Sequence, residues 1–245
     1  MLQAVVFDLD GVLLDSEQLW DAARRAVVAD HGGQWRDEAT GAMQGMSSPE
    51  WSAYMRSRLG VATSEARIVE LVVSDLLAHY DHELPVVPGA TEVVRRLGAQ
   101  WPLALASSST RVVIDHVLGL AALGDAFGVT VSSEEVARGK PAPDVYLAAA
   151  RGLDVTPGGC AAVEDSTSGI RAALAARMRV AVVPNPHFPP PDDVLASADL
   201  VVHGLIELTV DVLGALGGVD ARLDEEEAES FPASDPHSDW AGEGG

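Results

Sequence analysis

Short apolar runs alternate with helical patterns along most of this chain, and this alternation limits the folds that it can adopt. The runs are rich in Val, Ala and Leu and too short for helices, as expected for strands buried on both faces of a parallel sheet. They occupy residues 4–7, 103–106, 128–131, 160–163, 180–183 and 200–202, and helical patterns appear at 89–98, 110–119, 142–152 and 168–177. The pattern predicts an α/β fold, with a Rossmann-like parallel sheet core and helices on both faces.

Residues 16–85 break this alternation, because they hold only helical periodicity. Within them, Ser48-Pro49 has the form of a helix start, with a capping residue followed by proline in the first turn. Pro88-Gly89 then marks the return to the sheet. We therefore predict a Rossmann-like core made of residues 1–15 and 86–218, with an inserted all-helical cap domain at 16–85.

The chain is strongly acidic, with 16 Lys and Arg against 37 Asp and Glu and a formal net charge of -21. This charge would repel polyanions, so we expect neither nucleic acid nor an anionic membrane surface as a partner. Part of the charge lies in the run from Asp224 to Glu227, within sequence that is poor in apolar residues. We expect residues 219–245 to form a disordered acidic tail.

The sequence shows no sign of export or membrane insertion. No apolar stretch approaches the ~20 residues needed to span a bilayer. The start of the chain lacks the basic residues and cleavage site of a secretory signal. A single cysteine, Cys160, cannot form an internal disulfide, which is typical of a reducing compartment. We expect a cytoplasmic protein that is a monomer or a homodimer.

Polar residues follow the predicted strands at the points where those strands end. Asp8 and Asp10 follow the first, Ser107 the second and Glu164-Asp165 the fourth, while Lys140 lies in the loop after the third. Parallel strands place their carboxyl ends on one edge of a sheet, so these side chains should converge. Crowded carboxylates repel one another unless a cation lies between them, and oxygen ligands of this charge suit Mg²⁺. A metal, a lysine and a hydroxyl together predict a site for a phosphoryl group.

The motifs and their order resemble the haloacid dehalogenase-like superfamily, in its phosphatase branch. The matching segments are 7–12 (FDLDGV), 106–108 (ASS), 139–144 (GKPAPD) and 164–166 (EDS). The resemblance covers roughly residues 1–217 and extends to Asp15-Ser16-Glu17, which is similar to the hinge before the helical cap of β-phosphoglucomutase-like and phosphoglycolate-phosphatase-like members. Four motifs in this order, with a helical insertion after the first, make chance agreement improbable.

The resemblance implies a role for each matching residue. Asp8 would attack phosphorus and form an aspartyl-phosphate, and Asp10 would protonate the leaving alcohol and then activate water. Ser107, Ser108, Lys140 and the backbone N–H groups of Leu9 and Gly11 would bind the phosphoryl group.

The resemblance also implies a magnesium site built from the same loops. A side-chain oxygen of Asp8, the backbone carbonyl of Asp10 and the carboxylate of Asp165 would bind Mg²⁺. Glu164 would support them directly or through water. The implied function is a Mg²⁺-dependent phosphatase that hydrolyses a small phosphomonoester metabolite, such as a sugar phosphate or phosphoglycolate.

Two other functions stay open. Mutases of this family carry a histidine in the entry helix and an arginine in the cap, and residues 16–20 and 45–50 hold neither, which favours hydrolysis over the β-phosphoglucomutase type of reaction. A non-catalytic phospho-ligand binding or signalling module would also use clustered acids, but a second acid at Asp10 does not suit a long-lived acyl phosphate. Taken singly, the acids could be turn formers or helix caps, whereas Lys140 is the only lysine in the chain.

Overall fold

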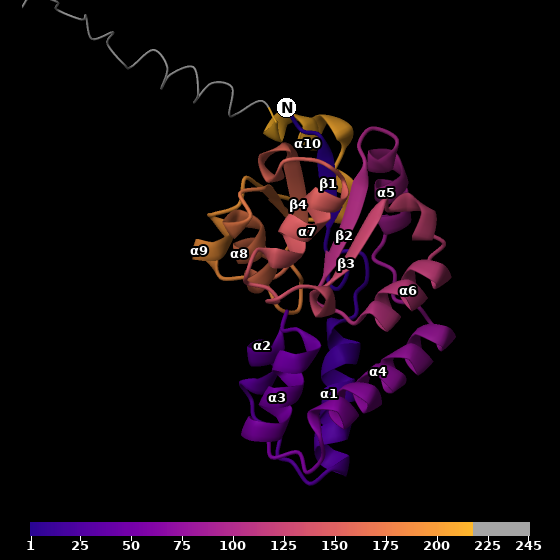
Figure 1. Cartoon of the computed structure of the whole chain (residues 1–245), viewed down its shortest axis with the longest axis vertical. Coiled ribbons are helices and arrows are strands. Elements are labelled where there is room, and N and C mark those ends of the chain that lie inside the picture. The colour runs from indigo at the N-terminus through magenta and orange to yellow at the C-terminus, as the bar shows by residue number, and fades with distance from the viewer. Residues whose placement is uncertain (218–245) are drawn as a thin grey trace, which may run out of the picture.

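The computed structural model describes residues 1–217, which form a six-stranded parallel sheet and the helices around it (Figure 1). The strands are β1 (Ala4–Phe7), β2 (Leu103–Ser107), β3 (Val129–Ser132), β4 (Cys160–Glu164), β5 (Arg179–Val182) and β6 (Leu200–Val201). They lie in the order β3-β2-β1-β4-β5-β6. The first strand of the chain is therefore central, and the residues that follow it enter the middle of the sheet edge.

Helices cover both faces of the sheet because alternate strand residues point to opposite sides. Val5 and Phe7 belong to one apolar cluster, and Ala4 and Val6 belong to the other. The first cluster is completed by α5 (Ala90–Gly98), α6 (Arg111–Leu120) and α10 (Val210–Leu216), and the second by α7 (Asp144–Gly152), α8 (Thr167–Ala175) and α9 (Asp192–Leu195). Short 3₁₀ turns lie at Gly124–Ala126, Ser133–Glu135, Pro157–Gly159 and Leu205–Glu207.

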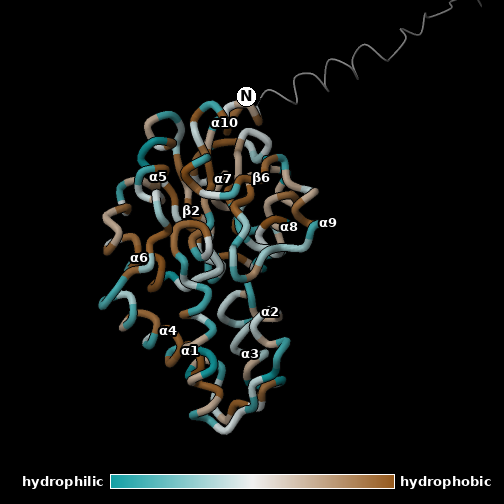
Figure 2. Tube along the Cα trace, turned by 180° about the vertical axis from the view of Figure 1, so that it is seen from behind, coloured by the Kyte–Doolittle hydropathy of each residue, from teal (hydrophilic) through white to brown (hydrophobic). Residues whose placement is uncertain are grey.

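Four helices form a separate lobe beyond the carboxyl ends of the strands (Figure 1). They are α1 (Glu17–Asp30), α2 (Ala39–Met43), α3 (Ser48–Arg58) and α4 (Glu65–His82). Figure 2 shows hydrophobic and hydrophilic segments alternating along α1 and α4, as expected for helices with one buried face. We call this lobe the cap and the sheet with its covering helices the core.

Local capping explains where several helices begin. Ser47 and Glu50 form a capping box at α3, in which the Ser47 backbone N–H donates to Glu50 Oε2 over 2.8 Å, and Pro49 lies in the first turn. Thr110 and Ser166 accept backbone N–H groups at the starts of α6 and α8. The second of these caps directly follows the Glu164-Asp165 motif, so it holds the motif at the junction of β4 and α8.

Two linkers join the cap to the core, and they lie side by side. The N–H of Asp15 donates to the carbonyl of Pro85 over 2.8 Å, and the N–H of Val87 donates to the carbonyl of Leu13 over 2.9 Å. Leu14 and Val86 form an antiparallel bridge between them. We call this pair of segments the hinge ribbon.

The predicted fold class is confirmed, since the sheet is parallel, helices lie on both faces and a helical insertion follows β1. The predicted strands and helices lie within a few residues of the observed ones. The predicted tail at 219–245 lies outside the described residues, as does residue 218. Among the described helices, none is long and apolar enough to cross a membrane.

Candidate active site

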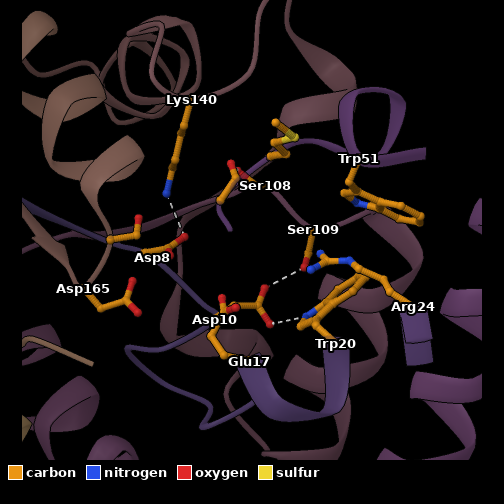
Figure 3. A pocket seen from close by; sticks show the side chains of 13 residues that line it. Asp8, Asp10, Glu17, Trp20, Arg24, Trp51, Ser108, Ser109, Lys140 and Asp165 are labelled. Carbon is orange, nitrogen blue, oxygen red and sulfur yellow. Dashed lines mark hydrogen bonds and ion pairs between the residues drawn. The ribbon is translucent and has the colours of Figure 1, made fainter. Parts of the chain in front are cut away.

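A small cavity of about 30 Å³ lies where the cap meets the carboxyl ends of the strands. The core contributes acids, serines and Lys140, and the cap contributes Glu17, Trp20, Arg24, Met46 and Trp51 (Figure 3). The structure therefore brings the predicted residues Asp8, Asp10, Lys140 and Asp165 into one cavity, although they come from three different loops.

The Asp8 carboxylate is held by a buried lysine. Lys140 Nζ lies 2.8 Å from Asp8 Oδ1 and 2.6 Å from Glu164 Oε1, and its side chain is 2% exposed. Burial alone would lower the pKa of Lys140, but Asp8 and Glu164 outweigh that effect and raise the pKa above its ordinary value. Burial raises the pKa of Asp8 to about 8, against the opposing effect of Lys140. In the absence of a metal ion, one lysine cannot fully compensate the charge of these acids.

Glu164 positions this lysine. Its Oε1 accepts hydrogen bonds from Lys140 Nζ and from the Tyr146 hydroxyl, the latter over 2.5 Å. Its Oε2 accepts from the Ser166 hydroxyl and from the backbone N–H groups of Asp165 and Ser166. Both oxygens are thus already engaged, so Glu164 is better suited to fix Lys140 than to bind a metal directly.

The cluster of buried acids fits a metal ion. Ligand atoms of Asp8, Glu164 and Asp165 lie within 4.8 Å of one another, and all three residues are buried. Asp165 Oδ1 is buried without a hydrogen-bond partner among the described residues, and burial followed by the charges of Glu164 and Asp8 raises the pKa of Asp165. An unpaired buried carboxylate oxygen beside further acids is the environment that a hard divalent cation stabilises.

Gly11 makes room for the Asp165 carboxylate. Its φ is +84°, and a Cβ at this position would overlap the Asp165 side chain. The turn after β1 therefore requires glycine both for its backbone conformation and for this close approach.

Asp10 is bound from both sides of the cavity. Its Oδ1 accepts the Ser16 hydroxyl over 2.6 Å and the Trp20 indole N–H over 2.9 Å, and its Oδ2 accepts the Ser109 hydroxyl over 2.6 Å. Trp20 comes from the cap and Ser109 from the core (Figure 3). The predicted acid and base consequently has its full set of donors only while the cap is closed over the core.

The serine segment after β2 divides its roles among three residues. Ser107 is fully buried and does not line the cavity, and its Oγ accepts the N–H of Ser109 over 3.0 Å. Ser108 lines the cavity and donates to the carbonyl of Gly45 in the cap over 2.9 Å. Phosphoryl binding by Ser107 and Ser108 stays a prediction, and the structure adds Ser109 as the serine that contacts Asp10.

The two predicted backbone donors differ. The N–H of Gly11 donates to the carbonyl of Leu14 over 2.7 Å, so it is not available to a phosphoryl group in this conformation. The N–H of Gly11 is thus used by a hydrogen bond within the turn that follows β1. The N–H of Leu9 has no partner within residues 1–217 and remains available.

Several side chains of the site escaped sequence reasoning. Two of them lie outside the motifs, namely Tyr146 and Asn185. The Tyr146 hydroxyl donates to Glu164, and the side-chain amide of Asn185 donates to Asp165 Oδ2 over 3.5 Å. Trp20 is buried in the cap, and its indole N–H also contacts Asp10. The sequence does carry a signal for three of the cap residues in the site. The spacing of three and four residues places Glu17, Trp20 and Arg24 on one helix face directly after the predicted hinge.

Comparisons with known proteins point to one enzyme family. Residues 2–177 match the family model described as haloacid dehalogenase-like hydrolase. Hexitol phosphatase B of Escherichia coli (strain K12) is 37% identical over 218 residues, which cover 86% of this chain and 96% of that protein. Fructose-1-phosphate phosphatase YqaB of the same strain is 30% identical over 185 residues, which cover 71% of this chain and 92% of that protein.

Solved structures show the same fold. The crystal structure of CbbY from Rhodobacter sphaeroides in complex with phosphate has a TM-score of 0.75 at 26% identity, covering 85% of this chain and 96% of that one. A β-phosphoglucomutase from Clostridium difficile has a TM-score of 0.78 at 23% identity, covering 91% of this chain and all of that one (100%). With a family model matched over residues 2–177, the chain belongs to the haloacid dehalogenase-like hydrolases.

Proposed function

We propose that this protein is a Mg²⁺-dependent phosphatase that hydrolyses a sugar or polyol monophosphate through an aspartyl-phosphate. The observation that carries the proposal is the Asp8–Lys140 contact of 2.8 Å beside the buried acid cluster, with Asp10 two residues further on and in the same cavity. The names of the two phosphatase relatives, which refer to a hexitol and to fructose 1-phosphate, support this substrate class.

Asp8 is the nucleophile in the proposed reaction. Lys140 holds its Oδ1, and no described residue hydrogen-bonds Oδ2, which leaves that oxygen to attack phosphorus. The ester P–O bond breaks, and the leaving alcohol takes a proton from Asp10. Asp10 then accepts a proton from the water that attacks the aspartyl-phosphate, and this step releases inorganic phosphate and restores the Asp8 carboxylate.

Charge compensation comes from Lys140 and from a metal. Mg²⁺ bound by Asp8 and Asp165 would neutralise the phosphoryl oxygens and reduce repulsion between them and the nucleophile. Glu164 keeps Lys140 directed at Asp8, so the lysine neutralises charge at the atom that reacts.

Substrate entry requires the cap to open. A cavity of about 30 Å³ accommodates a water molecule but not a phosphate ester. Opening would break the Trp20–Asp10 and Ser108–Gly45 hydrogen bonds, and closure would restore them. Closure thus excludes bulk water during the first displacement and places Asp10 for proton transfer.

The test is phosphate release from a panel of phosphomonoesters, measured with Mg²⁺ or with EDTA. The wild type should hydrolyse hexitol and hexose monophosphates with Mg²⁺ only, and Asp8→Asn should be inactive. Asp30→Asn, at an exposed position at the end of α1, is the matched control and should retain activity. Activity that survives Asp8→Asn would overturn the assignment of the nucleophile.

A further inference from the structure

Arg24 is a buried arginine whose guanidinium lies beyond ion-pair distance of every acid in residues 1–217, although the charges of Glu17 and Asp10 act on it. It is 6% exposed and lines the cavity from α1, and its side chain forms no ion pair or hydrogen bond with any other residue in 1–217. Its Nε is buried and unpaired. The guanidinium instead lies against two indoles, 5.0 Å from the Trp20 ring and 5.3 Å from the Trp51 ring (Figure 3).

The neighbouring residue, Arg25, shows that an arginine on this part of α1 can find an acidic partner. Arg25, one position further along α1, pairs with Asp21 over 2.6 Å and donates to Thr40 over 3.2 Å at the exposed surface. Arg24, in contrast, lines the cavity. A buried charge without a partner is costly, so a position that keeps one is suited to a ligand that supplies the missing hydrogen bonds.

Glu17 offers the complementary group. It lines the same cavity and is half-buried, and its side chain, like that of Arg24, forms no hydrogen bond or ion pair with another described residue. The two side chains lie seven residues apart on α1, on one face of the helix. The cavity therefore holds a set of donors and a pair of acceptors that the protein itself leaves unused.

A hydroxyl group satisfies both side chains, because it accepts a hydrogen bond from a guanidinium and donates one to a carboxylate. A second phosphate or a carboxylate on the substrate would satisfy Arg24 only, and it would lie close to Glu17 and Asp10, whose charges act on Arg24. From this juxtaposition we infer that Arg24 determines specificity by binding hydroxyl groups on the carbon chain of the substrate, together with Glu17. The expected ligand is a polyhydroxylated monophosphate rather than a bisphosphate.

The indoles make this recognition rigid. Trp20 and Trp51 pack edge-to-face, with ring centroids 6.1 Å apart, and hold the guanidinium between them. Trp20 also donates to Asp10, so one side chain contacts both the hydroxyl-binding arginine and the proposed acid and base. Binding of the substrate's carbon chain at Arg24 is thereby linked, through Trp20, to the position of Asp10.

The inference rests on the proposed phosphatase function, and the experiment separates the two. We would measure kcat and KM for a hexitol 6-phosphate, a hexose bisphosphate and phenyl phosphate, which has no hydroxyl group on its carbon skeleton. Arg24→Met should lower kcat/KM for the hexitol phosphate by roughly 10- to 100-fold, the range for a hydrogen bond to a charged group, and by less than about threefold for phenyl phosphate. Arg25→Met is the matched control and should change neither value.

Several outcomes would overturn the inference alone. These are an equal loss on the hexitol phosphate and phenyl phosphate, no loss on either, or a larger loss on the bisphosphate. If Arg24→Met fails to fold, Arg24→Lys decides, because it keeps the charge but loses the planar donor array and should show the same selective loss. A wild type that hydrolyses none of the three esters would refute the phosphatase proposal, and the inference with it.

Discussion

Replacing Glu17 by glutamine is expected to stabilise the protein above neutral pH and to leave its stability nearly unchanged in acid. Burial raises the pKa of Glu17 from 4.5 to about 7, with Arg24 opposing the shift and Asp10, Asp21 and Asp15 adding to it. The folded wild type therefore holds a proton on Glu17 more tightly than the unfolded chain does. Its stability should fall as the pH rises from about 4.5 to about 7 and should stay lower above that range.

The magnitude follows from the two pKa values. They differ by about 2.5, and each pKa unit corresponds to ~1.36 kcal/mol, so the ionised carboxylate costs at most about 3.4 kcal/mol of unfolding free energy. Glu17 is only half-buried, and solvent screening reduces this to about 1–3 kcal/mol. Glutamine has nearly the same shape and no charge, so Glu17→Gln avoids the cost.

Thermal unfolding at two pH values measures the effect. At pH 8.5 the midpoint of Glu17→Gln should exceed that of the wild type by roughly 3–10 °C, and at about pH 4.5 the two should nearly coincide. Glu70→Gln is the control, since Glu70 forms an exposed ion pair with Arg67 and should change little at either pH. Equal midpoints of Glu17→Gln and wild type at pH 8.5 would show that the carboxylate is solvated in the folded protein.

Three further substitutions test the rest of the site. Lys140→Met leaves the two buried carboxylates of Asp8 and Glu164 without their cationic partner, so it should abolish phosphate release and lower the unfolding free energy by about 3–5 kcal/mol in urea titrations; unchanged stability would mean that those acids are already neutral. Gly11→Ala forces a Cβ into the Asp165 carboxylate at a φ of +84°, and it should abolish the rise in thermal midpoint that Mg²⁺ gives the wild type; an undiminished rise would place the metal elsewhere. Trp20→Phe removes one of three donors to Asp10 and should lower kcat by about fivefold, whereas an unchanged kcat would show that Ser16 and Ser109 suffice.

The parts of the fold and site that could be predicted are those determined by local pattern. Short apolar runs marked the strands within a few residues, as at 160–163 against Cys160–Glu164. The convergence of the motif residues at the strand ends could be predicted from the sequence, because parallel strands place their carboxyl ends on one edge of the sheet. Asp8, Lys140 and Asp165 accordingly lie together in the structure.

The remaining features depend on tertiary packing, which a single sequence does not reveal. Tyr146 lies on a helix face that packs against the sheet, and only the folded structure shows its hydroxyl directed at Glu164. The same holds for the N–H of Gly11, which the turn uses internally. Motifs indicate which acids meet, but they do not indicate that Glu164 is saturated with donors while Asp165 keeps a free oxygen.

The hinge ribbon has a consequence for the order of events in a catalytic cycle. Because the two linkers are hydrogen-bonded to each other through Asp15, Pro85, Leu13 and Val87, bending of one linker is coupled to bending of the other. When the cap moves away from the core, the entrance widens and Trp20 separates from Asp10. Opening to solvent and full assembly of the donors around Asp10 therefore exclude each other, so exchange of molecules and chemistry alternate in time.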